Sequence, residues 1–220
     1  MAERLKIGVL ASGRGSNFQA IIDAVKAGKI DAEFAVCISD AADAYALTRA
    51  KENGIAALFI DPKASKDRAD YDGKIIEVLS KYDAGLVLLA GFLRLVSPTL
   101  VEAYKNKMMN IHPALLPSFP GLHVQGKAIR YGAKFSGCTV HFVDTGMDTG
   151  PIIIQAVVPV LPDDTEDALS ARILKQEHRI YPEAVRLFAE GKIEVDGRRV
   201  VIKNGPEIPD EFLVNPPVKE

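Results

Sequence analysis

The chain has 220 residues, of which 48% are hydrophobic and 25% are charged, and these proportions are typical of one compact globular domain. Its 27 basic and 29 acidic residues give a formal net charge of −2 at pH 7. This balance excludes a global basic field that would attract nucleic acid, and it excludes the acidic excess that keeps chains disordered.

The first apolar stretch and the two cysteines indicate the cellular compartment. Ile7 to Ala11 is too short for a signal peptide or a membrane span and leads directly into a glycine-rich turn. We therefore expect the mature protein to begin near Met1 and to stay in the cytoplasm. Cys37 and Cys138 lie far apart within apolar runs, so we expect two buried thiols and no disulfide.

In the first half of the chain, short apolar runs alternate with amphipathic segments of helical length. This alternation is typical of βαβ units with parallel strands. The predicted elements are, in order, a strand Leu5–Leu10, a helix Phe18–Val25, a strand Phe34–Ser39, an alanine-rich helix ending near Asn53 and Gly54, a strand Ala57–Ile60, a helix Arg68–Lys81, a strand Gly85–Ala90 and a short helix Pro98–Lys105.

The pattern changes after the next predicted strand, Met108–Ile111. The segment HPALLPSFPGLH, residues 112–123, holds three prolines and a glycine, so it is expected to be a shaped loop. Beyond it the predicted elements are a strand Thr139–Val143, the turn DTGMDTGP, a strand Ile152–Val160, a helix from Thr165 to about Ala189, and a hairpin around Asp196 and Gly197 followed by a proline-rich tail.

These elements predict an α/β fold with a mostly parallel, Rossmann-like open sheet and helices on both faces. We expect a single domain over residues 1–190. Residues 191–220 would add the hairpin and an extended tail, packed on or near that domain.

The loop between the first strand and the first helix is a candidate anion site. Unpaired backbone N–H groups and the helix dipole favour a phosphate there. Gly13 and Gly15 permit close approach of the backbone, and Ser16 and Asn17 could cap the helix and bind an oxyanion. The loop lacks the Lys-Ser/Thr ending of a P-loop, and Phe18 stands where a dinucleotide fingerprint has its third glycine. A tight turn with a capped helix explains this loop alone equally well.

Asn110 and His112 occupy alternate positions at the end of a buried strand, so both side chains point to the same side of the sheet. Ligands of open α/β sheets bind outside the carboxyl ends of the strands. The proline-rich loop from Pro113 to Gly121 would hold the pair in place. On its own, His112 could instead be a residue that only ties down this loop.

Asp148 lies in a second loop, which follows the strand that carries His141. An amide, an imidazole and a carboxylate without a serine or cysteine nucleophile favour direct acyl transfer over covalent catalysis. Asn110 would donate to a developing oxyanion, His112 would stabilise that oxyanion or act as a general acid, and Asp148 would favour the charged imidazole. Alone, Asp148 would be interpreted as a turn-forming aspartate.

Six strings occur in order between about Leu5 and Ala189: SGRGSNFQAII, LAGFLRLVSP, NIHPALLPSFPGLH, TVHFV, MDTGPII and QEHRIYPEA. With these strings the chain resembles the folate-dependent family of phosphoribosylglycinamide formyltransferases. The resemblance implies a metal-independent enzyme with the formyltransferase fold. Its reaction would transfer the formyl group of the co-substrate 10-formyltetrahydrofolate to the amine of 5′-phosphoribosylglycinamide, in de novo purine (IMP) biosynthesis.

The resemblance also implies roles for individual residues. Asn110, His112 and Asp148 would be catalytic. Gly15, Ser16 and Asn17 would hold the substrate phosphate, and Glu177 would contact the ribose. The folate side would be formed by Arg68, Leu93, Arg94, Leu95, Val96 and Asn110. The expected partners are these two small molecules, with no nucleic acid and no membrane, and a homodimer is compatible with the sequence.

Three positions have competing interpretations. Leu174 stands where the family is expected to have a polar substrate contact, so the ribose-side network could differ. His141 is as compatible with a structural histidine as with a site residue. Glu177 lies on a helix beside Lys175 and Arg179, where a solvated face is the default, and only the resemblance favours a functional role.

Three other functions compete with this one. A 10-formyltetrahydrofolate hydrolase would use the same three catalytic residues with water as acceptor, but that family usually has an N-terminal regulatory domain, and here the first strand begins at Leu5. A methionyl-tRNA formyltransferase needs a further C-terminal domain, which the roughly 30 residues after Ala189 are too few to form. A non-catalytic nucleotide-binding module would use SGRGSN and Asp40, and would leave the Asn, His and Asp group without a purpose.

Overall fold

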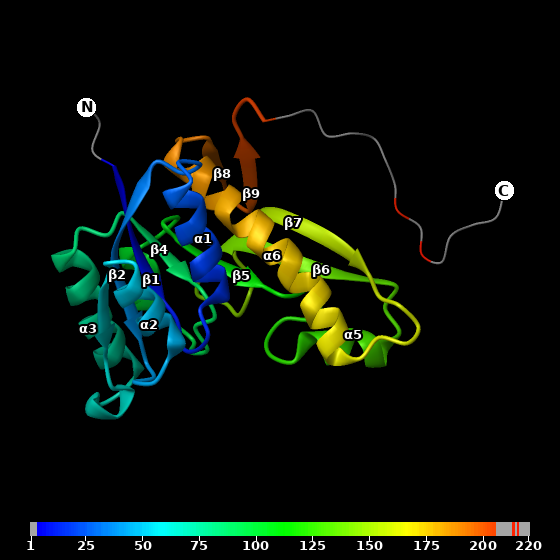
Figure 1. Ribbon diagram of the computed structural model, residues 1–220, viewed down its shortest axis with the longest axis horizontal. Coiled ribbons are helices and arrows are strands. Elements are labelled where there is room, and N and C mark those ends of the chain that lie inside the picture. Colours follow the sequence, from blue (N-terminus) through cyan, green and yellow to red (C-terminus); the bar gives the residue numbers. More distant parts are fainter. Residues whose placement is uncertain (1–3, 206–212, 214, 216–220) are drawn as a thin grey trace.

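The computed structural model describes residues 4–205, 213 and 215 (Figure 1). The strands are β1 Leu5–Leu10, β2 Ala32–Ser39, β3 Ala56–Phe59, β4 Leu86–Leu89, β5 Met108–His112, β6 Phe135–Phe142, β7 Ile152–Pro159, β8 Ile193–Asp196 and β9 Arg199–Ile202. The helices are α1 Ser16–Lys26, α2 Tyr45–Glu52, the 3-10 turn η1 Pro62–Ala64, α3 Arg68–Lys81, α4 Pro98–Ala103, α5 Val124–Tyr131 and α6 Glu166–Ala189.

Among the described residues, seven strands form the central sheet in the order β3-β2-β1-β4-β5-β6-β7. The pairings from β3 to β5 are parallel, and β6 and β7 add an antiparallel edge. Strands β2 and β3 are added in order on one side of β1, and the chain then crosses over so that β4 pairs with the other side of β1. The carboxyl ends of β1 and β4 therefore form a topological switch point, which is where ligands bind in sheets of this kind. The predicted mostly parallel α/β fold is confirmed.

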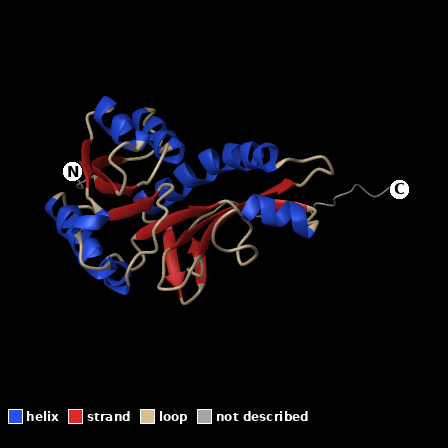
Figure 2. Cartoon of the chain, turned by 90° about the horizontal axis from the view of Figure 1, so that it is seen from below, coloured by secondary structure: helices blue, strands red, loops and turns tan. Residues whose placement is uncertain are grey.

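Helices cover both faces of the sheet (Figure 2), and each face has its own apolar core. On one face α1 and α6 lie side by side (Figure 1), and α2 adds Ala46 and Leu47 to the core beneath them. On the other face, α3 and α4 contribute Tyr71, Ile75 and Leu100 to the second core. Burial on both faces explains why the central strands read as continuous apolar runs.

The sequence patterns missed one α-helix, the short 3-10 turn η1 and half of one strand. Helix α5 was not predicted because it is short, contains Gly126 and has no side-chain cap at its N-terminus. The signal in the sequence that could have marked its C-terminus is Gly132, which adopts a left-handed conformation there. Strand β6 starts four residues before the predicted Thr139. A Cβ on Gly137 would lie 1.9 Å from the Ala156 carbonyl oxygen, so this glycine marks close approach of β7 rather than a break.

Other boundaries agree to within two residues, and the loop nature of the proline-rich segment is confirmed. Cys37 and Cys138 are buried and free, as predicted. The predicted hairpin is β8–β9, and the tail expected after it lies largely outside the described residues. Across the described part of the chain, none of the helices combines the length and apolarity needed to cross a bilayer.

Tyr181 ties α6 to the central strands. Its ring is fully buried, and its hydroxyl lies 2.9 Å from the Met109 carbonyl oxygen and 3.2 Å from that of Leu89. We expect Tyr181→Phe to lower the free energy of unfolding by about 1–3 kcal/mol, because buried carbonyls lose a donor. Urea denaturation measures this change. Tyr131→Phe, at a position 81% exposed, is the control, and equal effects of the two changes would contradict the assignment.

Candidate active site

A cavity of about 610 Å3 opens at the switch point. The loops after β4 and β5 and the β6–β7 connection line it, together with side chains from α1, α3 and α6. The sequence-predicted site residues on its wall are Asn17, Arg68, Leu93, Arg94, Leu95, Val96, Asn110, His112, Asp148 and Glu177. The structure thus brings together residues from both predicted substrate sides and from the predicted catalytic group.

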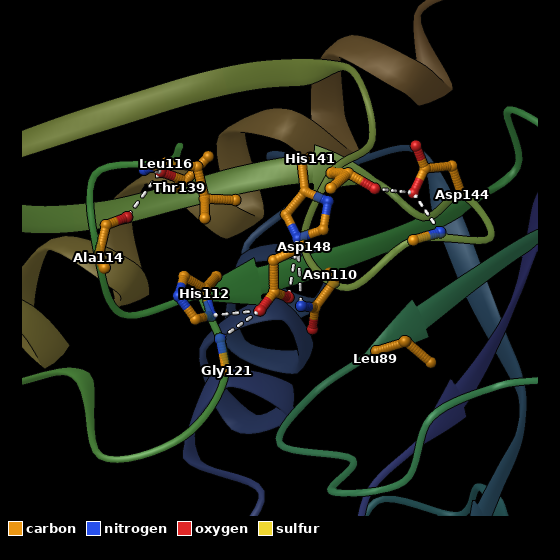
Figure 3. Close-up of polar contacts among 12 residues, drawn as sticks. Leu89, Asn110, His112, Ala114, Leu116, Gly121, Thr139, His141, Asp144 and Asp148 are labelled. Atoms are coloured by element: carbon orange, nitrogen blue, oxygen red, sulfur yellow. Dashed lines mark hydrogen bonds and ion pairs between the residues drawn. The ribbon is translucent and has the colours of Figure 1, made fainter. Parts of the chain in front are cut away.

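Asp148 lies between His112 and His141, with Asn110 beside them (Figure 3). Its Oδ2 atom is 3.5 Å from Nδ1 of His112, and its Oδ1 atom is 3.8 Å from Nε2 of His141. The imidazole of His112 is 5% exposed. The expected juxtaposition of amide, imidazole and carboxylate is therefore present, in a place where little water competes for the charges.

The backbone of the proline-rich loop orients both His112 and Asp148. The Phe119 carbonyl oxygen is 2.9 Å from Nε2 of His112, and because a carbonyl only accepts, Nε2 carries the hydrogen. The Gly121 N–H donates to Oδ2 of Asp148 at 2.9 Å. With Nε2 committed to Phe119, the Nδ1 atom of His112 is the one that faces the carboxylate.

The loop is itself held by the neighbouring antiparallel strands. The buried Thr139 hydroxyl donates to the Ala114 carbonyl oxygen at 2.7 Å and accepts from the Leu116 N–H at 3.1 Å. Gln155 of β7 donates to the Leu116 carbonyl oxygen at 2.9 Å. Side chains on β6 and β7 therefore fix the start of the loop whose far end orients His112 and Asp148.

His141 orients Asn110. Its Nδ1 atom is 2.8 Å from the Phe142 carbonyl oxygen and must carry a hydrogen, so in the neutral ring Nε2 accepts from Nδ2 of Asn110 at 3.2 Å. Burial lowers the pKa of His141, although the hydrogen bond to Phe142 and the nearby Asp148 carboxylate oppose this shift. The sequence left open whether His141 is a structural histidine or a site residue, and its contacts support both interpretations. One ring nitrogen is anchored to the backbone, and the other contacts Asn110.

The lowered pKa of His141 predicts a pH dependence of stability. Unfolded histidine takes up a proton near pH ~6.5, whereas the native ring resists protonation, so stability falls as the pH drops below that value. We expect His141→Gln to lose less unfolding free energy than the parent between pH 7 and pH 5. His178, whose pKa burial also lowers, is present in both proteins, so the difference between their urea denaturation curves isolates His141. Parallel pH profiles would refute this.

Helix α1 begins at the glycine loop, at Ser16 rather than the predicted Phe18. The prediction that Ser16 and Asn17 cap this helix is wrong. The N-cap residue is Gly15, in a left-handed conformation, and no side chain caps the helix. The first N–H groups of α1 therefore lack side-chain acceptors, and a helix N-terminus in this state favours an anion. Asn17 is buried and faces the cavity instead of solvent.

Glu177 is not on a solvated face, so that default interpretation of the sequence is wrong. It is 7% exposed, and one of its carboxylate oxygens accepts a hydrogen bond from Nδ2 of Asn17 at 2.7 Å. Burial raises the pKa of Glu177, and the bond from Asn17 partly offsets this. The Asn17 amide oxygen is buried without a partner among the described residues, so the pair retains an acceptor beside the cavity. Leu174, one turn earlier on α6, is 36% exposed.

The opposite side of the cavity is more apolar. Leu93 and Leu95 are exposed at its rim, and the Arg94 guanidinium stacks over the Tyr71 ring at 5.1 Å. Ser12 links this segment to the glycine loop: its N–H donates to the Gly91 carbonyl oxygen at 3.0 Å, and its hydroxyl accepts from the Leu93 N–H at 3.0 Å. The two loops at the switch point are therefore linked by two hydrogen bonds.

Sequence reasoning missed the backbone contacts of Phe119 and Gly121 and the role of Ser12. Both loop residues adopt positive φ, 53° for Phe119 and 84° for Gly121, and the glycine was the only visible signal of this conformation. Asp148 also adopts a positive φ of 55°, which aspartate tolerates better than most residues. The turn-forming interpretation of Asp148 is therefore correct locally, and it coexists with the contact to His112.

Comparisons with known proteins agree with this architecture. The model of the formyl transferase family matches residues 5–185. The phosphoribosylglycinamide formyltransferase of Escherichia coli is 43% identical over 203 residues, covering 89% of this chain and 96% of that protein. The crystal structure of glycinamide ribonucleotide transformylase 1 from Symbiobacterium toebii is 52% identical with a TM-score of 0.91, covering 93% of this chain and 96% of that one.

A formyltetrahydrofolate deformylase from Pseudomonas syringae is a more distant neighbour. Its structure superimposes with a TM-score of 0.85 over 92% of this chain and 67% of that one, but at 24% identity this likeness concerns the fold alone. The match of the family model over most of the chain, together with relatives above 40% identity across nearly their full length, decides the classification. This chain belongs to the formyl transferase family.

Proposed function

We propose that this enzyme transfers the formyl group of 10-formyltetrahydrofolate to the amine of 5′-phosphoribosylglycinamide, in purine biosynthesis. One observation carries the proposal: the Asn110, His112 and Asp148 group lies on the wall of the same cavity as the Asn17–Glu177 pair and the apolar rim at Leu93. An acyl-transfer group between an anion-binding helix end and an apolar surface suits a phosphorylated acceptor and a folate donor.

The acceptor would bind at the glycine loop. Its phosphate would accept from the N–H groups of Gly15, Ser16 and Asn17 at the start of α1. The ribose hydroxyls would reach Glu177, whose buried carboxylate the Asn17 amide holds. This placement directs the glycinamide amine toward β5 and its catalytic residues.

The folate would occupy the apolar side, along residues 93–96, with Arg68 as an exposed cationic contact at the rim. Its formyl group would then lie beside Asn110. Binding both reactants in line removes much of the entropic barrier, a contribution that reaches ~7–11 kcal/mol for well-aligned groups. The first contribution of the cavity wall to catalysis is therefore to align the two reactants.

The chemical step would be a direct displacement. The amine nitrogen attacks the formyl carbon, so a C–N bond forms and the carbonyl electrons move onto oxygen. Asn110 Nδ2 and the charged His112 stabilise that oxyanion, while Asp148 stabilises the charge on His112. As the tetrahedral intermediate collapses, the bond from carbon to the folate nitrogen breaks, and the proton lost by the attacking amine passes to that nitrogen with the help of Asp148. No metal ion takes part in this scheme.

Hydrolysis of 10-formyltetrahydrofolate is the alternative that uses the same catalytic group. The Asn17–Glu177 pair argues against it, because water as acceptor would need no hydroxyl-binding carboxylate in the cavity. A non-catalytic nucleotide-binding module would leave the buried contact of His112 with Asp148 unexplained.

The deciding experiment follows folate products with and without the acceptor. Spectroscopic release of tetrahydrofolate should require 5′-phosphoribosylglycinamide, and mass spectrometry should find the formylated acceptor in equal amount. Release at the same rate without the acceptor would establish the hydrolase instead. No release under either condition, in protein shown by circular dichroism to be folded, would overturn the proposal.

Location and assembly are part of the proposal. We place the protein in the cytoplasm and assign residues 1–190 to the catalytic domain, with the β8–β9 hairpin and the tail as an addition to it. A homodimer is testable by light scattering across a range of protein concentrations.

A further inference from the structure

We propose that Arg49 of α2 is a positioning residue for the phosphate-binding loop. This inference rests on the function proposed above and extends it, because Arg49 does not line the cavity and would act chiefly by holding the loop in place. It was not among the candidate residues suggested by the sequence.

Helix α2 packs directly on the glycine loop. The Ala46 N–H, in the first turn of α2, donates to the Gly13 carbonyl oxygen at 3.0 Å. A Cβ added to Gly15 would lie 2.9 Å from the Ala46 Cβ and 3.1 Å from its Cα. A glycine is thus required at position 15 both by its positive φ of 65° and by this close contact. Helix α2 therefore packs tightly against the loop.

Arg49, one turn along α2, contacts both the loop and the start of α1. Its Nε donates to the Arg14 carbonyl oxygen at 2.9 Å, and its Nη1 donates to Oε1 of Gln19, in the first turn of α1, at 2.9 Å. The guanidinium also lies over the Tyr45 ring, 4.8 Å from the centroid. The planar fork of arginine suits this bridge, because two donors of fixed geometry meet two separate acceptors.

The grip on Arg14 sets the direction of the next N–H group. In a trans peptide the C=O and N–H bonds point to opposite sides, so fixing the Arg14 oxygen toward Arg49 turns the Gly15 N–H away from α2. The bond to Gln19 fixes the start of α1, whose first N–H groups follow in sequence. Arg49 would therefore preorganise the N–H groups that receive the phosphate, and its own charge would favour a bound dianion.

The test compares Arg49→Ala, Arg49→Lys and the parent. Arg49→Ala should raise KM for the phosphorylated acceptor on the order of 10- to 100-fold and leave KM for the folate unchanged. kcat at saturating acceptor should stay close to that of the parent, because the chemical step occurs at β5. With the unphosphorylated glycinamide riboside as acceptor, kcat/KM should not change.

Two further variants separate the positioning effect of Arg49 from the effect of its charge and from a general loss of structure. Arg49→Lys keeps the charge but lacks the two-pronged fork, so it should recover only part of the lost affinity; full recovery would show that charge alone acts, and would overturn the positioning role. Lys51→Ala, an exposed basic residue in the last turn of the same helix, is the matched control and should leave every constant unchanged. Circular dichroism and thermal unfolding verify the fold of each variant.

Calorimetric titration with ribose 5-phosphate keeps the inference independent of the overall reaction. Weaker binding to Arg49→Ala than to the parent and to Lys51→Ala is the expected result. Equal binding to all three proteins would overturn the role of Arg49, even where formyl transfer is observed. Absence of formyl transfer in the parent, with the difference in binding intact, would instead refute the proposed reaction and leave the positioning of the loop supported.

Discussion

Replacing Asp148 by asparagine is expected to lower kcat by on the order of 10²- to 10⁴-fold while changing either KM much less. The carboxylate faces Nδ1 of His112 at 3.5 Å in a setting where His112 is almost fully buried, so it stabilises the charged imidazole. Asparagine has nearly the same shape, but its amide carries no charge to do so. Because the charge on His112 matters most when the oxyanion forms, the loss should appear in kcat.

Asp83→Asn is the matched control for this change. Asp83 also adopts a positive φ, 53° against 55° for Asp148, but it is exposed and pairs with Lys6 at the surface. Both substitutions remove one charge from a left-handed aspartate, a conformation that asparagine also accepts. Steady-state rates at saturating substrates measure the effect. An unchanged kcat in Asp148→Asn would refute the pairing with His112, and an equal loss in Asp83→Asn would point to a general effect of charge or folding.

The sequence predicted the frame of the molecule well because the central strands are buried on both faces. Such strands consist of uninterrupted apolar residues, as in Val87 and Leu88 of β4, and they are easily distinguished from the amphipathic helices between them. Where a strand contains a residue needed for close packing, the pattern fails. Gly137 hid the first half of β6 for this reason, and Gly126 contributed to hiding α5.

The side chains of the site were predictable, but the contacts that orient them were not. Strand alternation alone placed Asn110 and His112 on one side of the sheet. By contrast, the partners of Phe119 and Gly121 are backbone atoms, which the sequence does not distinguish from one residue to the next. Glu177 shows a third case: its helix carries Lys175 and Arg179 nearby, and only the packing of α6 against α1 reveals that this carboxylate is buried.

Asn110 has two proposed roles, in catalysis and in folate binding, and Asn110→Ala separates them. Its Nδ2 atom uses one hydrogen for Nε2 of His141, which leaves the second hydrogen for the oxygen of a formyl group in the cavity. A donor aimed at a developing oxyanion typically contributes about 3–4 kcal/mol, so kcat should fall by roughly 10²- to 10³-fold.

The two roles differ in which constant changes. A hydrogen bond that strengthens as the carbonyl oxygen becomes an oxyanion lowers kcat when it is removed, whereas a bond of equal strength in the bound substrate raises KM for the folate. If Asn110→Ala retains kcat and only binds the folate more weakly, Asn110 is a binding residue, and the oxyanion would depend on His112 alone. Presteady-state measurement of a single turnover decides the matter, because it isolates the chemical step from product release.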